Sequence, residues 1–139
     1  MKRQKGQAVV EFAIVLPFFL MLVFGIFYSG FLFADYMTLS NVARSSAREA
    51  ALLGANEYDE IKSSYRGNTK LLTNLYTWPE EDGSFEISSG TDVSDSVMVT
   101  IRTNLNTGFP GISAMDFLGL TLPRTYTIQY SMHDETAGS

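Results

Sequence analysis

The most prominent hydrophobic pattern is an apolar run from Phe12 to Ala34, 23 residues without a charged side chain. As an α-helix this run would extend about 35 Å at 1.5 Å per residue, which exceeds the roughly 30 Å hydrocarbon core of a bilayer. The pattern therefore predicts a helix, residues 12–34, that crosses a lipid membrane.

The charges at the two ends of the run predict its direction. Lys2, Arg3 and Lys5 precede it, and Asp35 is the first charge after it. An excess of positive charge marks the cytoplasmic side, so we expect a cytoplasmic N-terminus and an extracytoplasmic C-terminal region. A cleaved secretory signal would have an apolar region of about 7–15 residues and small residues at its end. Because Phe33 occupies one of those positions, an uncleaved span is favoured over a secretory signal peptide.

The helical pattern continues beyond the membrane span. Small and apolar residues recur at spacings of three and four, which marks one face of a helix: Leu39, Val42, Ala43, Ala47, Ala50 and Ala51. Gly54 is a natural stop, so we predict one helix from about residue 8 to 53, about 70 Å long, whose outer half supports the rest of the chain. Pro17 predicts a bend, either as a tolerated membrane proline or as a flexible point that helps the subunit leave the bilayer.

The next part of the chain predicts short helices and a turn. Asn56 can cap a helix over residues 57–66, which Gly67 would end. Residues 69–77 have apolar positions at helical spacing and predict another short helix. Residues 78–83 then predict a turn and an acidic loop.

The last third of the chain alternates between apolar and polar residues. Three segments with this period of two, residues 85–87, 97–102 and 125–130, predict antiparallel strands that pack on the outer half of the long helix. Residues 104–123 are too long for a hairpin loop. They carry apolar residues suited to covering a sheet edge or contacting a partner: Phe109, Pro110, Ile112, Met115, Phe117 and Leu118. The predicted fold class is α+β, a long N-terminal helix with a small C-terminal domain of short helices and about three strands.

Composition and charge narrow the possible chemistry. With 139 residues, the chain suffices for one folded domain at most. Residues 35–139 carry seven Lys and Arg against fourteen Asp and Glu, a net charge of -7, so nucleic-acid binding is not expected. The absence of cysteine excludes disulfides, thiolate metal sites and a cysteine nucleophile. With a single histidine, His133, in a polar tail, we predict no enzyme, no cofactor and no metal.

One weak metal-binding pattern lies between the predicted strands. Asp92, Ser94, Asp95 and Ser96 supply oxygen atoms in a short stretch. A calcium-binding EF-hand also needs a glycine and a distant glutamate at fixed positions, and these are missing. The stretch is therefore interpreted as an ordinary polar loop.

A carboxylate lies at the start of the apolar helix. An ionised Glu11 in hydrocarbon would cost at least about 2.5–3.5 kcal/mol without a partner. Glu11 therefore either stays at headgroup level, where water reaches it, or is paired with a positive charge.

The residues around Glu11 resemble a known signal. A short basic leader ending in Gly6, four further residues, Glu11-Phe12 and a long apolar helix resemble the class III signal sequence of type IV pilins and pseudopilins. The sequence EFAIVLP at 11–17, followed by NVARSSAREAA at 41–51, is similar to TadE-like pseudopilins of the tight-adherence (Tad or Flp) pilus. About 85 residues follow Gly54, which favours a TadE- or TadF-type minor subunit over the shorter major pilins.

The resemblance implies a structural role and a set of partners. Prepilin peptidase would cut between Gly6 and Gln7, and the new α-amino group at Gln7 would pair with Glu11 of a neighbouring subunit, next to Phe12. The implied divisions are a leader at 1–6, a helix at 7–54 and an extracytoplasmic domain at 55–139. The implied partners are the peptidase, other Tad pilins, the inner-membrane assembly platform and the lipid bilayer. The subunit would reside in the inner (cytoplasmic) membrane, enter a cell-surface pilus and contribute to its biogenesis and to adhesion.

Two alternatives stay open. Arg44 and Arg48 lie one turn apart, and such a pair either faces solvent or contacts the acidic body of the same or a neighbouring subunit. The whole protein can also be read as a permanently anchored single-span protein whose acidic outer domain recruits a partner.

Overall fold

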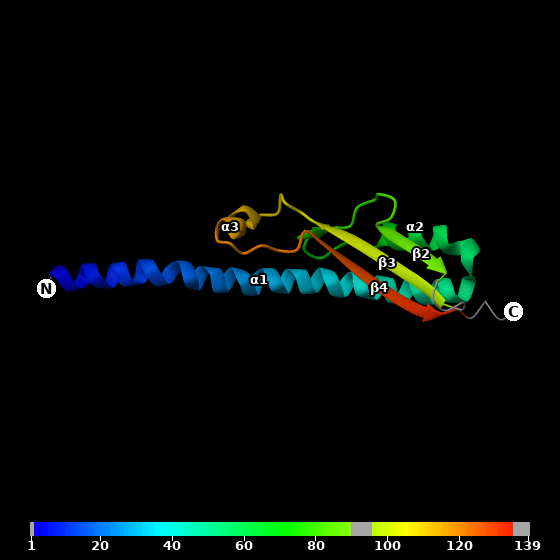
Figure 1. Ribbon diagram of the computed structural model, residues 1–139, viewed down its shortest axis with the longest axis horizontal. Helices are drawn as coiled ribbons and strands as arrows, with labels where there is room; N and C mark the ends of the chain where they lie inside the picture. Colours follow the sequence, from blue (N-terminus) through cyan, green and yellow to red (C-terminus); the bar gives the residue numbers. More distant parts are fainter. Residues whose placement is uncertain (1, 90–95, 135–139) are drawn as a thin grey trace.

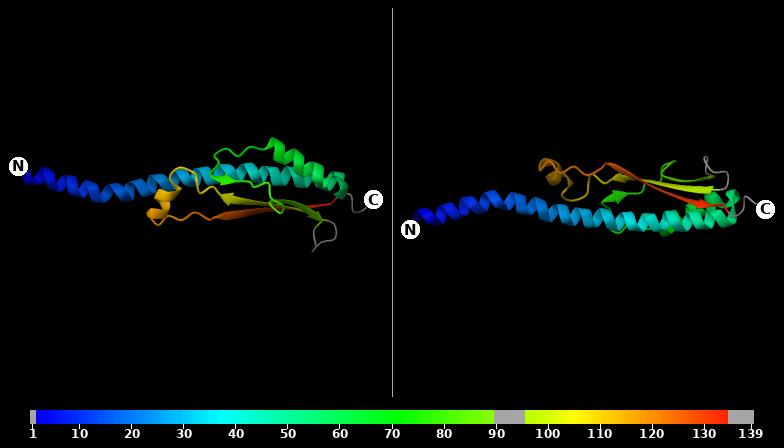
Figure 2. Two further views of the ribbon diagram at one scale, coloured as in Figure 1. Left: turned by 90° about the horizontal axis from the view of Figure 1, so that it is seen from above. Right: turned by 60° about the horizontal axis from the view of Figure 1, so that its bottom comes forward.

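The computed structural model describes residues 2–89 and 96–134, and of residues 2–5 only the backbone. A single helix, α1 (Lys2–Leu53), has 52 residues and runs the length of the molecule (Figure 1). The rest of the described chain lies along its second half, and the first part of α1 projects alone (Figures 1 and 2). The predicted combination of a long apolar helix with short helices and a small antiparallel sheet is confirmed, and its class is α+β.

The long helix ends where its sequence indicates. Gly54 adopts a φ of 82°, a conformation that favours glycine, and its amide donates to the carbonyl of Ala50 at 3.0 Å. The N-terminal end extends further than expected, to Lys2, and the helix continues through Pro17. The single continuous helix ending at Leu53 is therefore confirmed.

The predicted cap and stop of the second helix are wrong. A 3₁₀ turn, η1 (Ala55–Glu57), comes first, and α2 (Tyr58–Asn68) follows it. Asn56 lies inside the turn, because the chain reverses directly after α1, and it makes no capping hydrogen bond to α2. Gly67 lies inside α2, which ends only where Thr69 becomes extended.

The helix predicted over residues 69–77 is also wrong. This segment runs as bends and ends in a short strand, β1 (Tyr76–Thr77). Leu75 and Tyr76 are fully buried, and Asn74 has a φ of 56°. Contacts with distant parts of the chain therefore override the local helical spacing.

The sheet has four strands built around a central one. β2 (Phe85–Ser89), β3 (Ser96–Leu105) and β4 (Thr125–His133) include all three predicted strand segments. β4 pairs antiparallel along one side of β3, whereas β1 and β2 pair with successive parts of its other side. β1, with two residues, is the strand that the alternation did not predict.

The core lies between one face of α1 and the sheet. Leu39, Ala43 and Ala47 of α1 are fully buried, and so are Val99 and Ile101 of β3. Alanine leaves room for the sheet to approach the helix backbone closely, while leucine fills the wider spacing. The outer half of α1 is thus the support on which the body packs, as the spacing predicted.

A second cluster lies closer to the N-terminus. A six-residue helix, α3 (Ile112–Phe117), lies over α1 beyond the end of the sheet (Figure 1). Ile112 and Met115 of α3 are buried together with Tyr28 of α1. Part of the predicted connection at 104–123 therefore covers α1 itself and not a sheet edge.

Candidate functional site

The projecting part of α1 is apolar and uncovered. Every residue from 6 to 20 is exposed, and Phe12 and Phe18 expose 64% and 68% of their surface. A continuous apolar surface of this length has no stable place in water. The part of α1 from Gly6 onward is long and apolar enough to cross a membrane, and this part anchors the protein there.

The polar groups of the predicted cleavage and assembly motif lie within this projecting part. Gln7 Nε2 donates to Glu11 Oε1 at 3.3 Å, one helical turn away. None of the ion pairs between described side chains involves Glu11. The structure thus places Gln7 and Glu11 together on one exposed face, with Phe12 beside them.

Packing within the structure does not require the residue at position 6, Gly6, to be glycine. A Cβ atom added there would meet nothing within 4 Å. Glycine inside a helix costs about 1 kcal/mol relative to alanine, so this choice is unfavourable for the fold as it stands. Pro17, a little further along, is also exposed.

The two arginines lie far from this motif, on the part of α1 that carries the body. The guanidinium of Arg44 stacks on the ring of Tyr130 in β4, with 5.7 Å between its central carbon and the ring centre. Arg48 is exposed, and none of the ion pairs between described side chains involves it. Arg44 thus contacts its own body through an aromatic ring, whereas Arg48 points to solvent.

Sequence reasoning missed the role of Asp35. Its side chain is fully buried, and its two carboxylate oxygens accept from the backbone amide of Thr73 at 3.0 Å and from the Thr73 hydroxyl at 2.6 Å. Asp35 was interpreted only as the first charge after the membrane span. No local signal links it to a residue 38 positions away, so only the tertiary structure reveals this bond.

A second missed contact lies within the apolar run. Tyr28 is 6% exposed, and its hydroxyl donates to the carbonyl oxygen of Pro110. Phe31 and Phe109 meet edge to face, with ring centres 6.0 Å apart. Gly111 has a φ of 88°, and a Cβ there would collide with the Tyr28 hydroxyl. The only signal in the sequence was a pair of hydroxyl side chains, Tyr28 and Ser29, within the apolar run.

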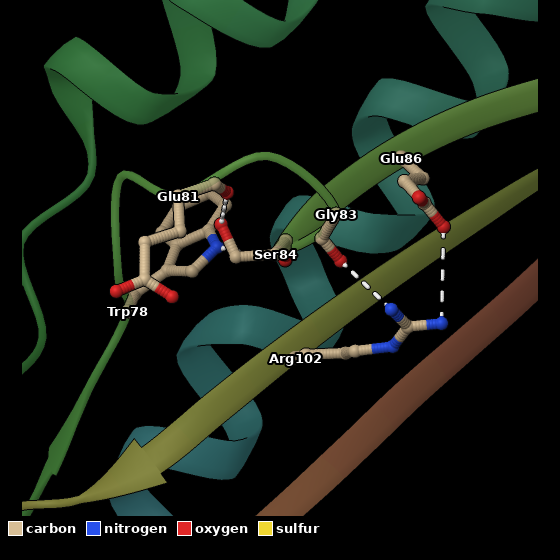
Figure 3. Close-up of polar contacts among 6 residues, drawn as sticks. All are labelled: Trp78, Glu81, Gly83, Ser84, Glu86 and Arg102. Atoms are coloured by element: carbon tan, nitrogen blue, oxygen red, sulfur yellow. Dashed lines mark hydrogen bonds and ion pairs between the residues drawn. The ribbon is translucent and has the colours of Figure 1, made fainter.

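The acidic loop between β1 and β2 is fixed by polar contacts (Figure 3). The Ser84 hydroxyl donates to the Glu81 carbonyl at 2.8 Å, and the Trp78 ring nitrogen donates to the Ser84 carbonyl at 3.3 Å. Arg102 donates to the Gly83 carbonyl at 3.3 Å and lies 3.9 Å from Glu86. An exposed ion pair of this kind stabilises a fold only slightly. These contacts order the loop.

The remaining candidates offer no further site in the described part of the chain. Within residues 2–89 and 96–134, no three His, Cys, Asp or Glu side chains are grouped to hold a metal ion. Asp92, Ser94 and Asp95 lie outside the described residues, and Ser96 begins β3. His133 is exposed at the last position of β4.

Fold and site together define a membrane-anchored protein with an uncovered N-terminal helix and a small α+β body. The sequence model of the TadE-like protein family matches residues 6–48, which confirms the resemblance noted in the sequence. That match covers about a third of the chain and shows that its N-terminal helix is similar to TadE-like proteins. No curated protein and no solved structure matches the chain.

Proposed function

We propose that the protein is a minor pilin, or pseudopilin, of a Tad-type pilus assembly or secretion apparatus. It is processed by prepilin peptidase after Gly6 and contributes to pilus biogenesis and surface adhesion. The observation that carries this proposal is the overlap between the TadE-like match at 6–48 and the helix whose apolar side chains project beyond the body. Such a helix can exchange lipid for the helices of neighbouring subunits without unfolding the body.

The topology follows from the flanking charges. Lys2, Arg3 and Lys5 hold the leader on the cytoplasmic side of the inner membrane, so the acidic body is extracytoplasmic. Prepilin peptidase reaches the Gly6–Gln7 bond from the cytoplasmic side. The glycine is explained by this step, since it offers the enzyme a backbone without a side chain.

Glu11 serves assembly. Cleavage creates an α-amino group at Gln7, one helical turn from the carboxylate of Glu11 in the same chain. In a filament the amino group of one subunit pairs with Glu11 of the next, and Phe12 packs beside the pair. Each charge alone is costly in an apolar core, whereas the pair is tolerated. Arg48, exposed on the outer half of α1, is available to the acidic body of a neighbour in the same filament, and Arg44 lies one turn from it.

The cleavage step is tested by co-expression with the cognate prepilin peptidase and N-terminal sequencing of the membrane-extracted protein. We expect a chain that begins at Gln7, and we expect Gly6→Ala to retain residues 1–6. Gly30→Ala is a matched control, because a Cβ at Gly30 also meets nothing within 4 Å. A wild-type chain that keeps Lys2 and Arg3 would support the permanent-anchor alternative.

The assembly step is tested with Glu11→Gln, which removes the charge and keeps the shape. We expect normal processing but at least about a tenfold lower content in sheared pili, since a lost buried ion pair exceeds 1.4 kcal/mol. Equal incorporation of the variant and the wild type would remove Glu11 from the mechanism.

A further inference from the structure

Residues 107–122, here called the apolar lobe, include α3 and carry a single charged side chain, that of Asp116. The lobe lies against α1 at Tyr28 and Phe31, inside the apolar run of that helix. A cleft of about 360 Å³ between the two is lined by Gly25 of α1 and by Leu120 and Leu122 of the lobe, among others. The body therefore extends along α1 into the part that is apolar enough to lie in lipid.

The depth of the lobe follows from the helix rise. A bilayer core takes about 20 helical residues, and counting from Phe12 places its outer edge near Phe31. At 1.5 Å per residue, Tyr28 then lies about 5 Å and Gly25 about 9 Å inside that edge. Interfacial protein segments typically bury their apolar face about 5–10 Å into the boundary between headgroups and acyl chains.

The exposed surface of the lobe suits the same place. Phe117 is 89% exposed, and Phe24 and Phe27 of α1 are 39% and 59% exposed. Moving a phenylalanine this exposed from water into a membrane interface is favourable, because it removes apolar surface from water. The lobe and this part of α1 thus both expose apolar surface that suits contact with lipid.

The backbone hydrogen bonds of the lobe suit an environment with little water. Five amides between Ile112 and Leu120 donate to carbonyls within the lobe, those of Ile112, Met115, Leu118, Gly119 and Leu120. Unpaired backbone groups are costly near hydrocarbon, so internal pairing permits shallow insertion. The carboxylate of Asp116 itself stays at headgroup level, where water still reaches it, while apolar side chains of the lobe point deeper. Arg124 is exposed just beyond the lobe, and its long cationic side chain suits contact with lipid phosphates.

From these observations we propose that the apolar lobe inserts into the extracytoplasmic membrane interface beside α1. Its occupant is phospholipid, with acyl chains in the cleft and against Phe117. The body is then held to the bilayer at two places, by the helix and by the lobe. This inference rests on membrane anchoring and does not depend on cleavage at Gly6 or on assembly into a pilus.

The test uses the absence of cysteine in the chain. Single cysteines at Phe117→Cys, Ile26→Cys and Ser88→Cys receive nitroxide spin labels, and each uncleaved full-length protein is reconstituted in phosphatidylethanolamine and phosphatidylglycerol vesicles. Ile26 is 66% exposed on α1 and serves as the lipid reference, and Ser88 is exposed in β2 and serves as the water reference. Collisions with oxygen and with a nickel chelate, present on both sides of the bilayer, report the depth of each label.

We expect the oxygen-to-nickel collision ratio at Phe117 to lie within about twofold of the ratio at Ile26 and several-fold above that at Ser88. A ratio equal to that at Ser88 would overturn the proposal. So would spin–spin broadening at Phe117 that disappears on dilution with unlabelled protein, because a second copy would then cover the lobe. Phe117 is nearly fully exposed, so its replacement removes little packing, and circular dichroism checks that the variant folds.

Discussion

The two halves of α1 are one continuous helix with opposite surroundings. From Gly6 to Leu20 every residue is exposed and large apolar side chains dominate. From Asp35 to Leu53 one face is buried, and after Leu39 and Val42 its members are small: Ala43, Ser46, Ala47, Ala50 and Ala51. Large apolar side chains suit contact with lipid or with another helix that replaces it. Small side chains let the sheet of the same chain approach the helix backbone. Side-chain size along the helix therefore distinguishes the half that meets a changing environment from the half that meets a permanent one.

The comparison is tested most strongly by the same substitution in each half. Leu39→Ala removes a fully buried side chain, and we expect the body to lose about 3 kcal/mol of unfolding free energy. Leu22→Ala, at a position 60% exposed, should change it by less than about 0.5 kcal/mol. Urea unfolding in detergent micelles, followed by the fluorescence of the single tryptophan, Trp78, measures both. Equal losses would mean that the projecting half also supports the body.

The junction between the halves is tested at Asp35. Asp35→Ala leaves the amide and hydroxyl of Thr73 without their acceptor, and we expect a loss of about 2–3 kcal/mol. Thr73→Ser is the matched control, since it retains both donors and should cost far less. The same unfolding measurement applies. A small effect of Asp35→Ala would show that water replaces the carboxylate without cost.

The contact within the membrane half is tested with two glycines of the lobe. Gly111 and Gly119 both have positive φ, but only at Gly111 would a Cβ strike Tyr28. We expect Gly111→Ala to cost about 1–2 kcal/mol more than Gly119→Ala, because the strain is shared and the collision is not. Thermal unfolding of the two variants in the same detergent gives the difference. Identical melting curves would mean that the lobe shifts away from α1 at no cost.

A change that is absent at neutral pH is expected in the alkaline range. Burial raises the pKa of Tyr126 to about 12 from the usual 10, and burial also raises the pKa of Tyr76. The folded body then keeps a proton that the unfolded chain releases, so its stability is full below pH 10 and falls as the pH rises towards 12. Tyr126→Phe should reduce this fall without destabilising the body at pH 7. Tyr130→Phe, in the same strand, controls for loss of a strand hydroxyl, and an unchanged slope in Tyr126→Phe would contradict the assignment.

Local patterns predicted the elements whose burial follows their own periodicity. The buried face of α1, its end before Gly54 and the alternation in β3 and β4 all follow from residues close in sequence. The segment 69–77 did not follow its pattern, because Asp35 holds Thr73 in a bend and the sheet takes up Tyr76. These interactions join positions about 30 to 40 residues apart, and local spacing contains no information about them.

The candidate site divides in the same way. Gly6, Gln7 and Glu11 were predicted from a short motif, since all three lie within two helical turns. Asp35 and Tyr28 were not, because each acts on a loop that is distant in sequence. The role of a carboxylate or a hydroxyl at the edge of an apolar run cannot be assigned until its hydrogen-bond partner is known.

The bonds from α1 to the body have a mechanical consequence. Asp35 and Tyr28 hold two separate loops, at Thr73 and Pro110, while the strands of the sheet run beside the helix (Figure 1). A pulling force applied along α1 therefore loads these bonds and the packed face in parallel, as shear. Bonds sheared together resist far more force than bonds peeled one after another, so tension on the N-terminal helix should be transmitted to the body before the body unravels.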